Sequence, residues 1–281
     1  SAAFGGGGLG FSPRAGLRAT FYDRSATSAE PTERKYVYAG LDVNARLSRV
    51  FGSDGDAGFG RIRHSIEPTI AYTYIPHVEQ GDIPLYDAVD TAAALNTTTI
   101  AIINRLTAHY KASKDALKFT TFDLMVFRLS QSYDLNVKED IPGAARRRSD
   151  ILGELSVVTP RGFTLSANGT YNTYSEVLSS HSVGVGATVG VVSVNLSEQF
   201  IKEPATQFLI GGTGFRLGKW NLGGQWWRDM ENRKTTQEEY RAHYMSQCWG
   251  IGFSYVIKPG ETQFVAMMDL KGIGGRQYGG Q

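Results

Sequence analysis

The five histidines are the first residues to consider for chemistry, because imidazole serves both as a general base and as a metal ligand. They are scattered along the chain, at His64, His77, His109, His181 and His243. Only one of them lies in a loop rich in acids, which contains His77, Glu79, Asp82, Asp87 and Asp90. A hydrolase needs a nucleophile, a histidine and an acid that can meet, and a metal site needs a diagnostic ligand spacing. Neither pattern is present, so we predict no enzyme, no metal and no cofactor, and a solvated loop.

Two further motifs could bind phosphate. Arg146, Arg147 and Arg148 form a run whose guanidinium groups can pair bidentately with phosphate, although a solvated charged loop is the simpler interpretation. The small-residue run 182–190 superficially resembles a dinucleotide-binding loop. It lacks the strand, turn and helix that such a loop requires, so we interpret its glycines as strand residues.

Composition narrows the function classes. The 29 basic and 27 acidic residues leave a net charge of +2, which predicts no nucleic-acid partner. The single cysteine, Cys248, cannot form an internal disulfide, so it is a free thiol or half of a bridge to another segment or chain. The start Ser1-Ala2-Ala3 has no signal-peptide features, which suggests a mature, processed or excised chain. No window approaches the roughly 18 apolar residues of a membrane helix.

A period of two runs through the chain and indicates half-buried strands. Between residues 163 and 173 the odd positions are mostly apolar and the even ones polar; the same alternation holds over 37–48 and 62–74. Apolar and polar residues that alternate in this way suit a wall with lipid outside and water inside. The fold class predicted is an all-β, antiparallel transmembrane β-barrel.

Counting such segments predicts about fourteen strands in one domain covering residues 1–281. Their ranges are 13–23, 34–49, 60–76, 93–111, 115–137, 148–159, 161–173, 177–189, 191–201, 205–217, 219–230, 236–245, 248–257 and 262–272. Most long connections fall at one end of these strands and most short ones at the other, with 50–59 the exception. Bacterial barrels place the short turns in the periplasm. Cys248 then lies at the periplasmic rim, where an oxidising compartment permits a disulfide.

Aromatic residues support a membrane interpretation. Trp220 and Trp226 lie six residues apart on one face of a predicted strand, and Trp249 and Tyr255 repeat that spacing on another. Such pairs can bracket the hydrocarbon layer as interfacial girdles.

Several motifs closely resemble the barrel of the lipopolysaccharide-assembly (LptD) family. They occur in the family's order and span roughly residues 13–275: Arg63 to Pro76, Asp82 to Asp87, Asn96 to Thr99, Asn104 to Leu106, Cys248-Trp249 and Leu270 to Gly274. The resemblance implies an outer-membrane protein of a Gram-negative bacterium with a twenty-six-stranded barrel. Such a barrel receives lipopolysaccharide from the periplasmic Lpt bridge components, is filled by an LptE-like lipoprotein plug and is surrounded by membrane lipid.

The chain departs from that plan in two respects. It has room for about fourteen strands, and it lacks the periplasmic jellyroll domain of the family. We therefore interpret it as the C-terminal portion of such a barrel or as a shortened homologue. The alternative is a small outer-membrane porin of about fourteen strands that passes solutes by diffusion.

The resemblance also assigns roles to residues. It implies that the closing strand forms one side of a lateral gate that releases lipopolysaccharide into the outer leaflet. Its residues are Phe264, Val265, Ala266, Met267, Met268, Asp269, Leu270 and Lys271. Cys248 would pair with N-terminal cysteines of the family, and Arg146, Arg147 and Arg148 would contact lipopolysaccharide phosphates.

Pro68 and a set of polar positions complete the predicted site. Pro68 removes a ladder hydrogen bond from the middle of a strand, so we expect a weak point with a bulge or bend there. The polar interior is expected to contain Arg14, Arg18, Asp42, Arg46, Arg63 and Glu67.

Overall fold

The computed structural model describes residues 4–6, 8–53, 55, 57–84, 86, 92–116, 118–138, 140 and 146–270. The chain divides into two compact units, one made of Ser1–Glu154 and Thr170–Val177, the other of Leu155–Gly169 and Leu178–Gln281. Within the described ranges the regular elements are β-strands, and the strand pairs inside each unit are antiparallel. The predicted all-β antiparallel class is confirmed. In the same ranges, no helix has the length and apolarity needed to span a membrane.

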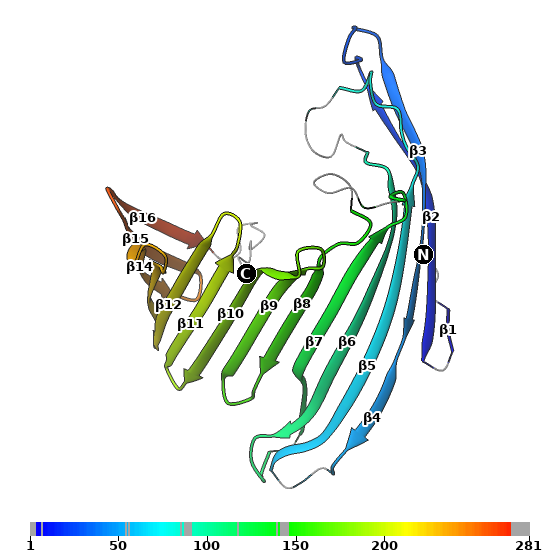
Figure 1. The fold of residues 1–281 in the computed structure, drawn as a ribbon. Helices are drawn as coiled ribbons and strands as arrows, with labels where there is room; N and C mark the ends of the chain where they lie inside the picture. Colours follow the sequence, from blue (N-terminus) through cyan, green and yellow to red (C-terminus); the bar gives the residue numbers. More distant parts are fainter. Residues whose placement is uncertain are drawn as a thin grey trace. The chain divides into compact units, whose positions relative to one another are not determined.

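The first unit is built on seven strands that follow one another along the sheet (Figure 1). They are β1 (Phe4–Gly6), β2 (Leu9–Tyr22), β3 (Thr32–Ala45), β4 (Leu47–Phe51), β5 (Gly58–Ile75), β6 (Leu95–Lys111) and β7 (Thr120–Asp134). Their order is β1-β2-β3-β5-β6-β7, and β4 continues the line of β3 along β5. Two more strands, β8 (Ile151–Val158) and β9 (Phe163–Asn172), contribute residues to both units.

The second unit contains the C-terminal strands in sequence order (Figure 1). They are β10 (Val177–Val189), β11 (Val192–Ile201), β12 (Thr206–Leu217), β13 (Trp220–Asp229), β14 (Lys234–Met245), β15 (Trp249–Lys258) and β16 (Glu261–Leu270). Each pairs with the next through a connection of two to four residues. These sequential hairpins give the up-and-down connectivity that the alternating pattern predicts.

The number of strands agrees with the prediction. The described residues contain sixteen strands, of which all but the three-residue β1 and the five-residue β4 have eight residues or more. That leaves fourteen, and the predicted division of residues 236–257 around Cys248 is confirmed by β14 and β15. Several boundaries were wrong. The strand predicted from residue 13 begins at Leu9, and the one predicted over 34–49 is divided between β3 and β4. The strand predicted from residue 115 begins at Thr120, because the Ala116 N–H donates to the Ser113 carbonyl at 3.2 Å and closes a turn.

The register confirms that each sheet has a polar and an apolar face. Val37 on β3 lies opposite Leu17 on β2, and both side chains are more than half exposed. One residue along, Tyr38 lies opposite Gly16, so the faces alternate as the pleat requires. A shift of one residue would exchange the two faces, so the sequence pattern determines the register.

Among the described strands of the second unit, three hairpin turns are two residues long, and two of them begin with glycine. Gly190 and Gly218 have φ +60° and open the β10–β11 and β12–β13 turns. The primed turn types of two-residue hairpins need positive φ at the first central position, which a side chain disfavours. The β15–β16 turn begins with Pro259 and has its positive φ, +78°, at Gly260 instead.

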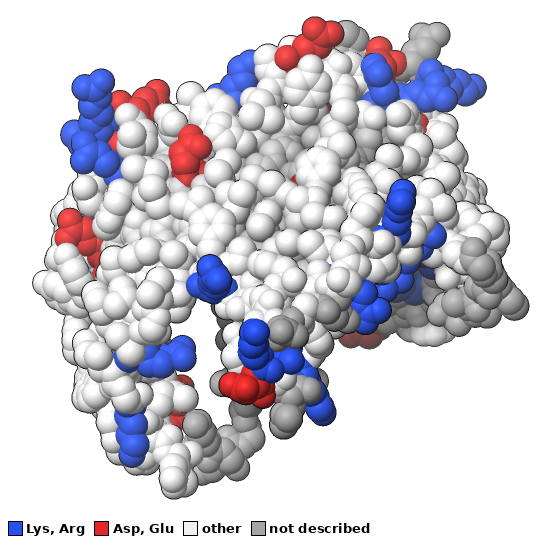
Figure 2. Space-filling view, turned by 90° about the horizontal axis from the view of Figure 1, so that it is seen from below, with Lys and Arg blue, Asp and Glu red and all other residues white. Residues whose placement is uncertain are grey.

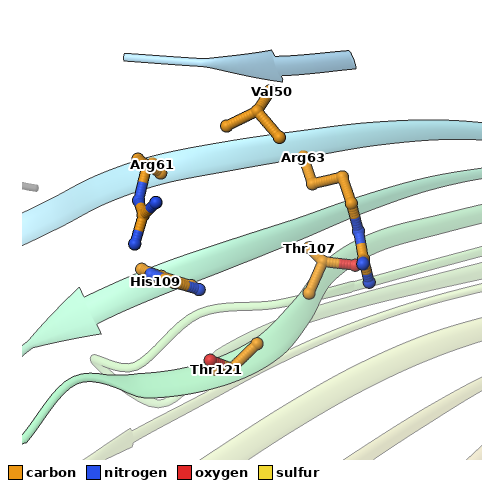
Figure 3. Close-up of a pocket in the computed structure, with 6 residues that line it drawn as sticks. All are labelled: Val50, Arg61, Arg63, Thr107, His109 and Thr121. Carbon is orange, nitrogen blue, oxygen red and sulfur yellow. The ribbon is translucent and has the colours of Figure 1, made fainter. Parts of the chain in front are cut away.

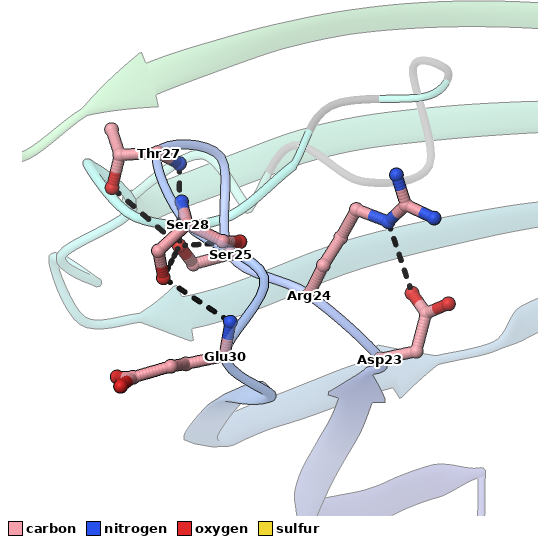
Figure 4. Close-up of polar contacts among 6 residues, drawn as sticks. All are labelled: Asp23, Arg24, Ser25, Thr27, Ser28 and Glu30. Atoms are coloured by element: carbon pink, nitrogen blue, oxygen red, sulfur yellow. Dashed lines mark hydrogen bonds and ion pairs between the residues drawn. The ribbon is translucent and has the colours of Figure 1, made fainter.

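The β2–β3 connection folds on itself through Ser25 (Figure 4). The Ser25 hydroxyl accepts the N–H groups of Thr27 at 3.2 Å and Ser28 at 2.8 Å. The Ala26 N–H donates to the Asp82 carbonyl at 2.9 Å, which ties this connection to the one after β5. Backbone groups in this loop are therefore satisfied locally, as serine-rich turns allow.

The buried residues concentrate in the first unit. Apart from glycine and proline, the buried residues of the described first unit are Tyr22, Arg34, Ser65, Ile83, Ala92, Ala101, Thr107 and Ala108. In the described second unit, Ile210 is the buried residue that is neither glycine nor proline. Many large apolar side chains remain exposed instead. A sheet that exposes so much apolar surface needs an apolar surrounding.

Candidate functional site

The polar face of the first unit carries an ionic ladder that crosses neighbouring strands. Glu67 on β5 lies between two arginines: its Oε1 is 3.0 Å from Arg46 Nε and 3.7 Å from Arg105 Nε. Arg105 on β6 also donates to Asp123 on β7, which accepts a further hydrogen bond from Thr107 at 2.9 Å. The Glu67 side chain is only 14% exposed, so this charge is held by its partners rather than by bulk water.

The ladder extends to the strands on the N-terminal side. Arg14 on β2 pairs with Asp42 on β3 and donates to the Thr73 hydroxyl on β5 at 3.1 Å. It crosses β3 at Gly40, where a Cβ would lie 2.6 Å from the Arg14 Nε. We call the six charged residues Arg14, Asp42, Arg46, Glu67, Arg105 and Asp123 the ionic ladder. Five of these six residues lie on strands, one each on β2, β3, β5, β6 and β7. The register between the strands places all five on the same face.

The opposite face is apolar. On β6, Ile100 and Ile102 are 43% and 45% exposed, and Ile70 on β5 is 46% exposed beside Ile100. In the second unit the same division recurs, with Leu222 exposed on β13. Alternation of this kind is the signature of a strand between lipid and water.

Aromatic rings form a row across three strands of the second unit. Tyr244 on β14 lies between Trp220 on β13 and Trp249 on β15, with ring centroids 5.1 and 5.4 Å apart. Toward the other end of the strands, Tyr255 lies opposite Phe264, and both are exposed. Tryptophan and tyrosine are the residues enriched in interfacial girdles. The girdle itself stays a prediction.

The last described strand, β16, is an exposed edge of the described sheet. All ten of its residues are exposed, and within the described chain its pairing is with β15 alone. Phe264, Ala266, Met268 and Leu270 share the face of the β15 aromatics, and Val265, Met267 and Asp269 share the other. Lys271, the eighth predicted gate residue, lies outside the described residues. An exposed edge strand of this kind is a template for pairing with another strand.

One side-chain tie reaches β16 from two strands away. His243 Nε2 on β14 lies 3.1 Å from Asp269 Oδ2 on β16. The imidazole crosses β15 above Gly250 and Gly252, where a Cβ would lie 3.2 Å from the His243 ring. The two glycines therefore leave the space that this tie needs.

Cys248 and Pro68 are both among the residues that the structure describes. Cys248 is an exposed free thiol in the β14–β15 connection. The bulge expected at Pro68 was wrong, because the β5–β6 register runs through Pro68 and Ile102 without a shift. Instead, the backbone pairing of β5 with β3 and β4 is interrupted at residues 67–68. The interruption lies between the pairs Asn44–Thr69 and Leu47–Ile66. Proline has no N–H to donate there, so the strand loses pairing without changing register.

The arginine run is organised around Tyr174. The guanidinium carbons of Arg146 and Arg148 lie 5.1 and 5.3 Å from the Tyr174 ring centroid. The Tyr174 hydroxyl donates to Asp140 at 2.7 Å, and the Arg147 N–H donates to the same carboxylate at 2.6 Å. The Tyr174 hydrogen bond, more than the Arg147 N–H and the arginine charges, holds the pKa of Asp140 below its usual range. All three arginines remain exposed.

A basic cavity lies between four strands of the first unit, and the sequence analysis did not predict it. Its volume is about 180 Å³, and it is lined by Val50, Arg61, Arg63, Thr107, His109 and Thr121 (Figure 3). Arg63 was placed on the polar face from the sequence, and the Arg61-Ile62-Arg63 spacing is the signal that pointed to two arginines on one side of a strand.

The remaining polar groups do not assemble a catalytic or metal site in the described chain. His77 and Glu79 lie 3.6 Å apart with both side chains strongly exposed, and Asp87 and Asp90 lie outside the described residues. His181 pairs with Glu198 at 3.0 Å. Among the described residues, no three His, Cys, Asp or Glu side chains cluster as metal ligands do.

The surface charge forms separate groups. On the face shown in Figure 2, Lys and Arg side chains lie in several groups, with acidic side chains near some of them. This face has no single basic stripe of the kind that nucleic acid needs, in the part of the chain that is described.

Comparison with protein families matches residues 3–226 to the family described as LptD, LPS transport system D. Curated relatives carry the name LPS-assembly protein LptD. One from Nitrosococcus oceani is 20% identical and aligns with 95% of this chain and 39% of its own length. One from Burkholderia pseudomallei strain K96243 is 26% identical over 95% of this chain and 38% of its own. The chain therefore spans about two fifths of the relatives it matches.

Solved structures give a weaker likeness. Mutants of the Rhodopseudomonas blastica porin align with 93% of this chain and 96% of their own, at 10% identity and a TM-score of 0.40. No conclusion rests on a score of that size.

Proposed function

Because the chain belongs to the LptD family and is an outer-membrane protein of a Gram-negative bacterium, we propose that it forms part of a barrel that delivers lipopolysaccharide to the outer leaflet. The observation that carries the proposal is the division of the strands into a polar face, which carries the ionic ladder in the first unit, and an exposed apolar face. A phosphorylated saccharide needs a wet, charged path, and its acyl chains need an apolar one.

The polar face would guide the saccharide without covalent chemistry. Each ladder carboxylate has an arginine partner, so the wall offers both charges in fixed positions. A path with fixed charges of both signs can bind a polar headgroup weakly at several positions and release it again. This function needs no nucleophile and no metal.

The single barrel domain of residues 1–281 would be completed by strands from elsewhere in the full protein. The relatives are more than twice as long as the segment aligned here, which leaves room for those strands and for the domain that receives lipid. An LptE-like lipoprotein plug would face the polar side, and periplasmic Lpt components would supply the lipid. Cys248 would form a disulfide with a cysteine outside this chain.

The exposed strand β16 is the candidate edge of the lateral gate. It has a neighbour on one side in the described chain, and its polar face is held by the His243–Asp269 tie. Lateral opening requires one strand pair that separates more easily than the rest. The interruption at Pro68 is a second weak point, placed inside the wall rather than at its edge.

The test is site-specific photocrosslinking in the full-length protein in cells. A photoreactive residue replaces Ser48 on the polar face or its neighbour Leu47, 66% exposed on the apolar face of the same strand. Both lie in the half of the wall that the topology turns toward the periplasm, where the membrane leaflet contains phospholipid. Lipopolysaccharide should crosslink at position 48 and not at 47.

Equal crosslinking at both positions, or none at 48 while the protein is inserted, would contradict the proposed path. A conducting pore formed by the full-length protein without lipopolysaccharide crosslinks would favour the porin alternative. A photoreactive residue at Met267 tests the gate, since its crosslinks should require continuing supply of lipopolysaccharide from the periplasmic side.

A further inference from the structure

The exposed apolar face of the second unit contains a groove that the proposed path along the polar face does not use. The groove has a volume of about 390 Å³ and lies over β12, β13 and β14. Its lining side chains on this face are Thr213, Trp226, Arg228, Thr235, Glu238 and Tyr240. Thr213 and Tyr240 lie on either side of Gly224, which shares the face of Leu222 on β13. A groove with charged residues is therefore present on the side that borders lipid.

Two glycines shape the floor of the groove. The Trp226 ring lies over Gly211, where a Cβ would be 2.4 Å from the ring. At Gly224 a Cβ would lie 3.8 Å from the Tyr240 ring, which is an ordinary contact distance, so the space above β13 is open. Trp226 and Tyr240 are 39% and 52% exposed. Their rings give the groove apolar walls beside an unfilled floor, which suits an acyl chain.

Arg228 supplies the groove with a positive charge. The residue is exposed, and within the described chain its guanidinium forms no ion pair. Two carboxylates of the same face have other partners. Glu238 accepts from the Tyr240 hydroxyl at 3.1 Å. Glu198 pairs with His181 at 3.0 Å. Because a guanidinium offers a planar fork of N–H donors that matches two phosphate oxygens, Arg228 is suited to a phosphate.

The depth of Arg228 matches a membrane interface. A lipid-facing arginine costs about 2–4 kcal/mol at the bilayer midplane and about 0–1 kcal/mol near the interface. Arg228 is the next-to-last residue of β13, and Tyr240 shares a row with the exposed Tyr255 and Phe264. Tyrosine and tryptophan are enriched at this depth. The predicted topology turns the adjoining connection, residues 230–233, toward the outer side.

We propose that this groove binds the phosphorylated headgroup of lipopolysaccharide on the outside of the wall, at the outer leaflet. Arg228 holds a phosphate, and Glu238 accepts hydrogen bonds from saccharide hydroxyls. One acyl chain lies over Gly224, between Trp226 and Tyr240. The identity of the lipid rests on the proposed function, and the inference adds a binding position within the last four strands of the described order.

The test is photocrosslinking of the full-length protein reconstituted in phosphatidylethanolamine vesicles. The vesicles contain a small share of one probe: lipopolysaccharide, the same lipopolysaccharide after enzymatic removal of its phosphates, or phosphatidylglycerol. A photoreactive residue replaces Thr213, which lines the groove. In a second protein it replaces Phe215, which lies on the same face two residues along β12 and reports the lipid beside the groove.

Lipopolysaccharide should crosslink at Thr213 at least about tenfold above its share of the lipid, and at Phe215 in proportion to that share. Arg228→Gln should remove the enrichment at position 213. The matched control is Arg216→Gln, which removes an exposed arginine from the polar face of β12 and should leave the enrichment unchanged. Arg228→Lys should keep part of it, because the charge remains while the fork geometry is lost.

Gly224→Val tests the floor of the groove without changing its charge. A Cβ at this position meets no heavy atom closer than 3.8 Å, so the strand should stay folded while the added methyl groups occupy the floor. The enrichment at Thr213 should fall although Arg228 is intact. Unchanged enrichment would overturn the placement of the acyl chain.

Enrichment that persists in the folded and inserted Arg228→Gln variant overturns the site. Equal enrichment of the dephosphorylated lipid overturns the role of Arg228 in holding a phosphate. Equal enrichment of phosphatidylglycerol, lost with Arg228→Gln, overturns lipopolysaccharide as the ligand. Failure of this inference is separable from failure of the proposed function, because crosslinking at Ser48 reports the polar path independently of Arg228.

Discussion

The ionic ladder and the terminal strands β14–β16 differ in how strongly side chains link one strand to the next. In the ladder, each carboxylate has an arginine on a neighbouring strand, and the strands beneath are long, with eighteen residues in β5 and seventeen in β6. In the terminal strands, β16 has ten residues that are all exposed, and one tie from His243 reaches it. Charge pairs that cross several strands make a wall that is hard to separate, whereas a short edge with one tie can part.

The difference shows where the weak positions of a sheet can be placed. Breaking a strand pair inside the ladder would leave partly buried charges without partners. Breaking the pair at β16 would expose little more than is exposed already, because the strand has no cover on either face. The described chain therefore combines a wall crossed by several charge pairs with an exposed edge strand.

The largest effect is expected from a charge placed on the apolar face of the edge strand. Ala266→Arg puts a guanidinium at the middle of β16 beside Phe253, and should lower the free energy of unfolding by about 2–4 kcal/mol. Val265→Arg, one residue away on the polar face, is the control and should cost much less. Urea unfolding in lipid vesicles, followed by tryptophan fluorescence, measures both. Equal costs would mean that β16 has no lipid-facing side.

Removal of the central ladder carboxylate should have the next largest effect. Glu67→Gln leaves Arg46 and Arg105 without their shared partner, which should destabilise the wall by about 1.5–3 kcal/mol. Glu79→Gln is the matched control, because the Glu79 side chain is 96% exposed. The same unfolding assay applies. If Glu67→Gln unfolds like the control, the ladder is not what strengthens this region.

Loss of the tie to β16 should have a smaller and strictly local effect. His243→Ala removes an ion pair whose side chains are 33% and 63% exposed, worth about 0.2–1 kcal/mol. Amide hydrogen exchange should accelerate in β16 while β5 and β6 stay protected. His181→Ala, which removes a comparable pair between β10 and β11, should leave β16 exchange unchanged. Acceleration throughout the second unit would show a general structural role instead.

The smallest effect concerns a loop outside both regions. Tyr174→Phe removes the hydrogen bond that lowers the Asp140 pKa, so that pKa should rise toward its ordinary value. A depressed carboxyl pKa contributes stability above about pH 4 that is lost as pH falls through the lowered value. Carboxyl ¹³C NMR titration of labelled aspartate measures the shift. An unchanged titration midpoint in the variant would show that the Tyr174 hydroxyl is not the cause.

Much of the fold was predictable because alternation is a local property. The apolar positions around Val37 and the polar positions around Glu67 fix which face each residue takes, and the fourteen long strands follow from counting such segments. The boundary at Thr120 was missed because residues 112–116 form a turn through a backbone hydrogen bond that side-chain pattern does not encode. The bulge predicted at Pro68 was wrong for a related reason. The missing N–H of Pro68 is accommodated by a gap in the backbone pairing of β5 with β3 and β4, while the pairing of β5 with β6 continues.

The candidate sites divide in the same way. The disulfide of Cys248 and the gate role of β16 remain predictions, whereas the basic cavity was not foreseen from the sequence. Its lining comes from four strands, and the sequence could place Arg63 on the polar face without showing that His109 and Thr121 lie beside it. The organisation of Arg146 and Arg148 around Tyr174 was equally invisible, since twenty-six residues separate Arg148 from that ring.

The sequence by itself determined the solvent on each side of the sheet, the number of long strands and the family. These depend on a period of two and on local motifs, which each segment carries alone. Only the tertiary structure decided which charges pair with one another, because pairing depends on register between strands far apart in the chain. Glu67 on β5 is held between Arg46 and Arg105, which lie 21 and 38 residues away along the chain. That arrangement arises from the neighbours of β5, and no property of β5 alone contains it.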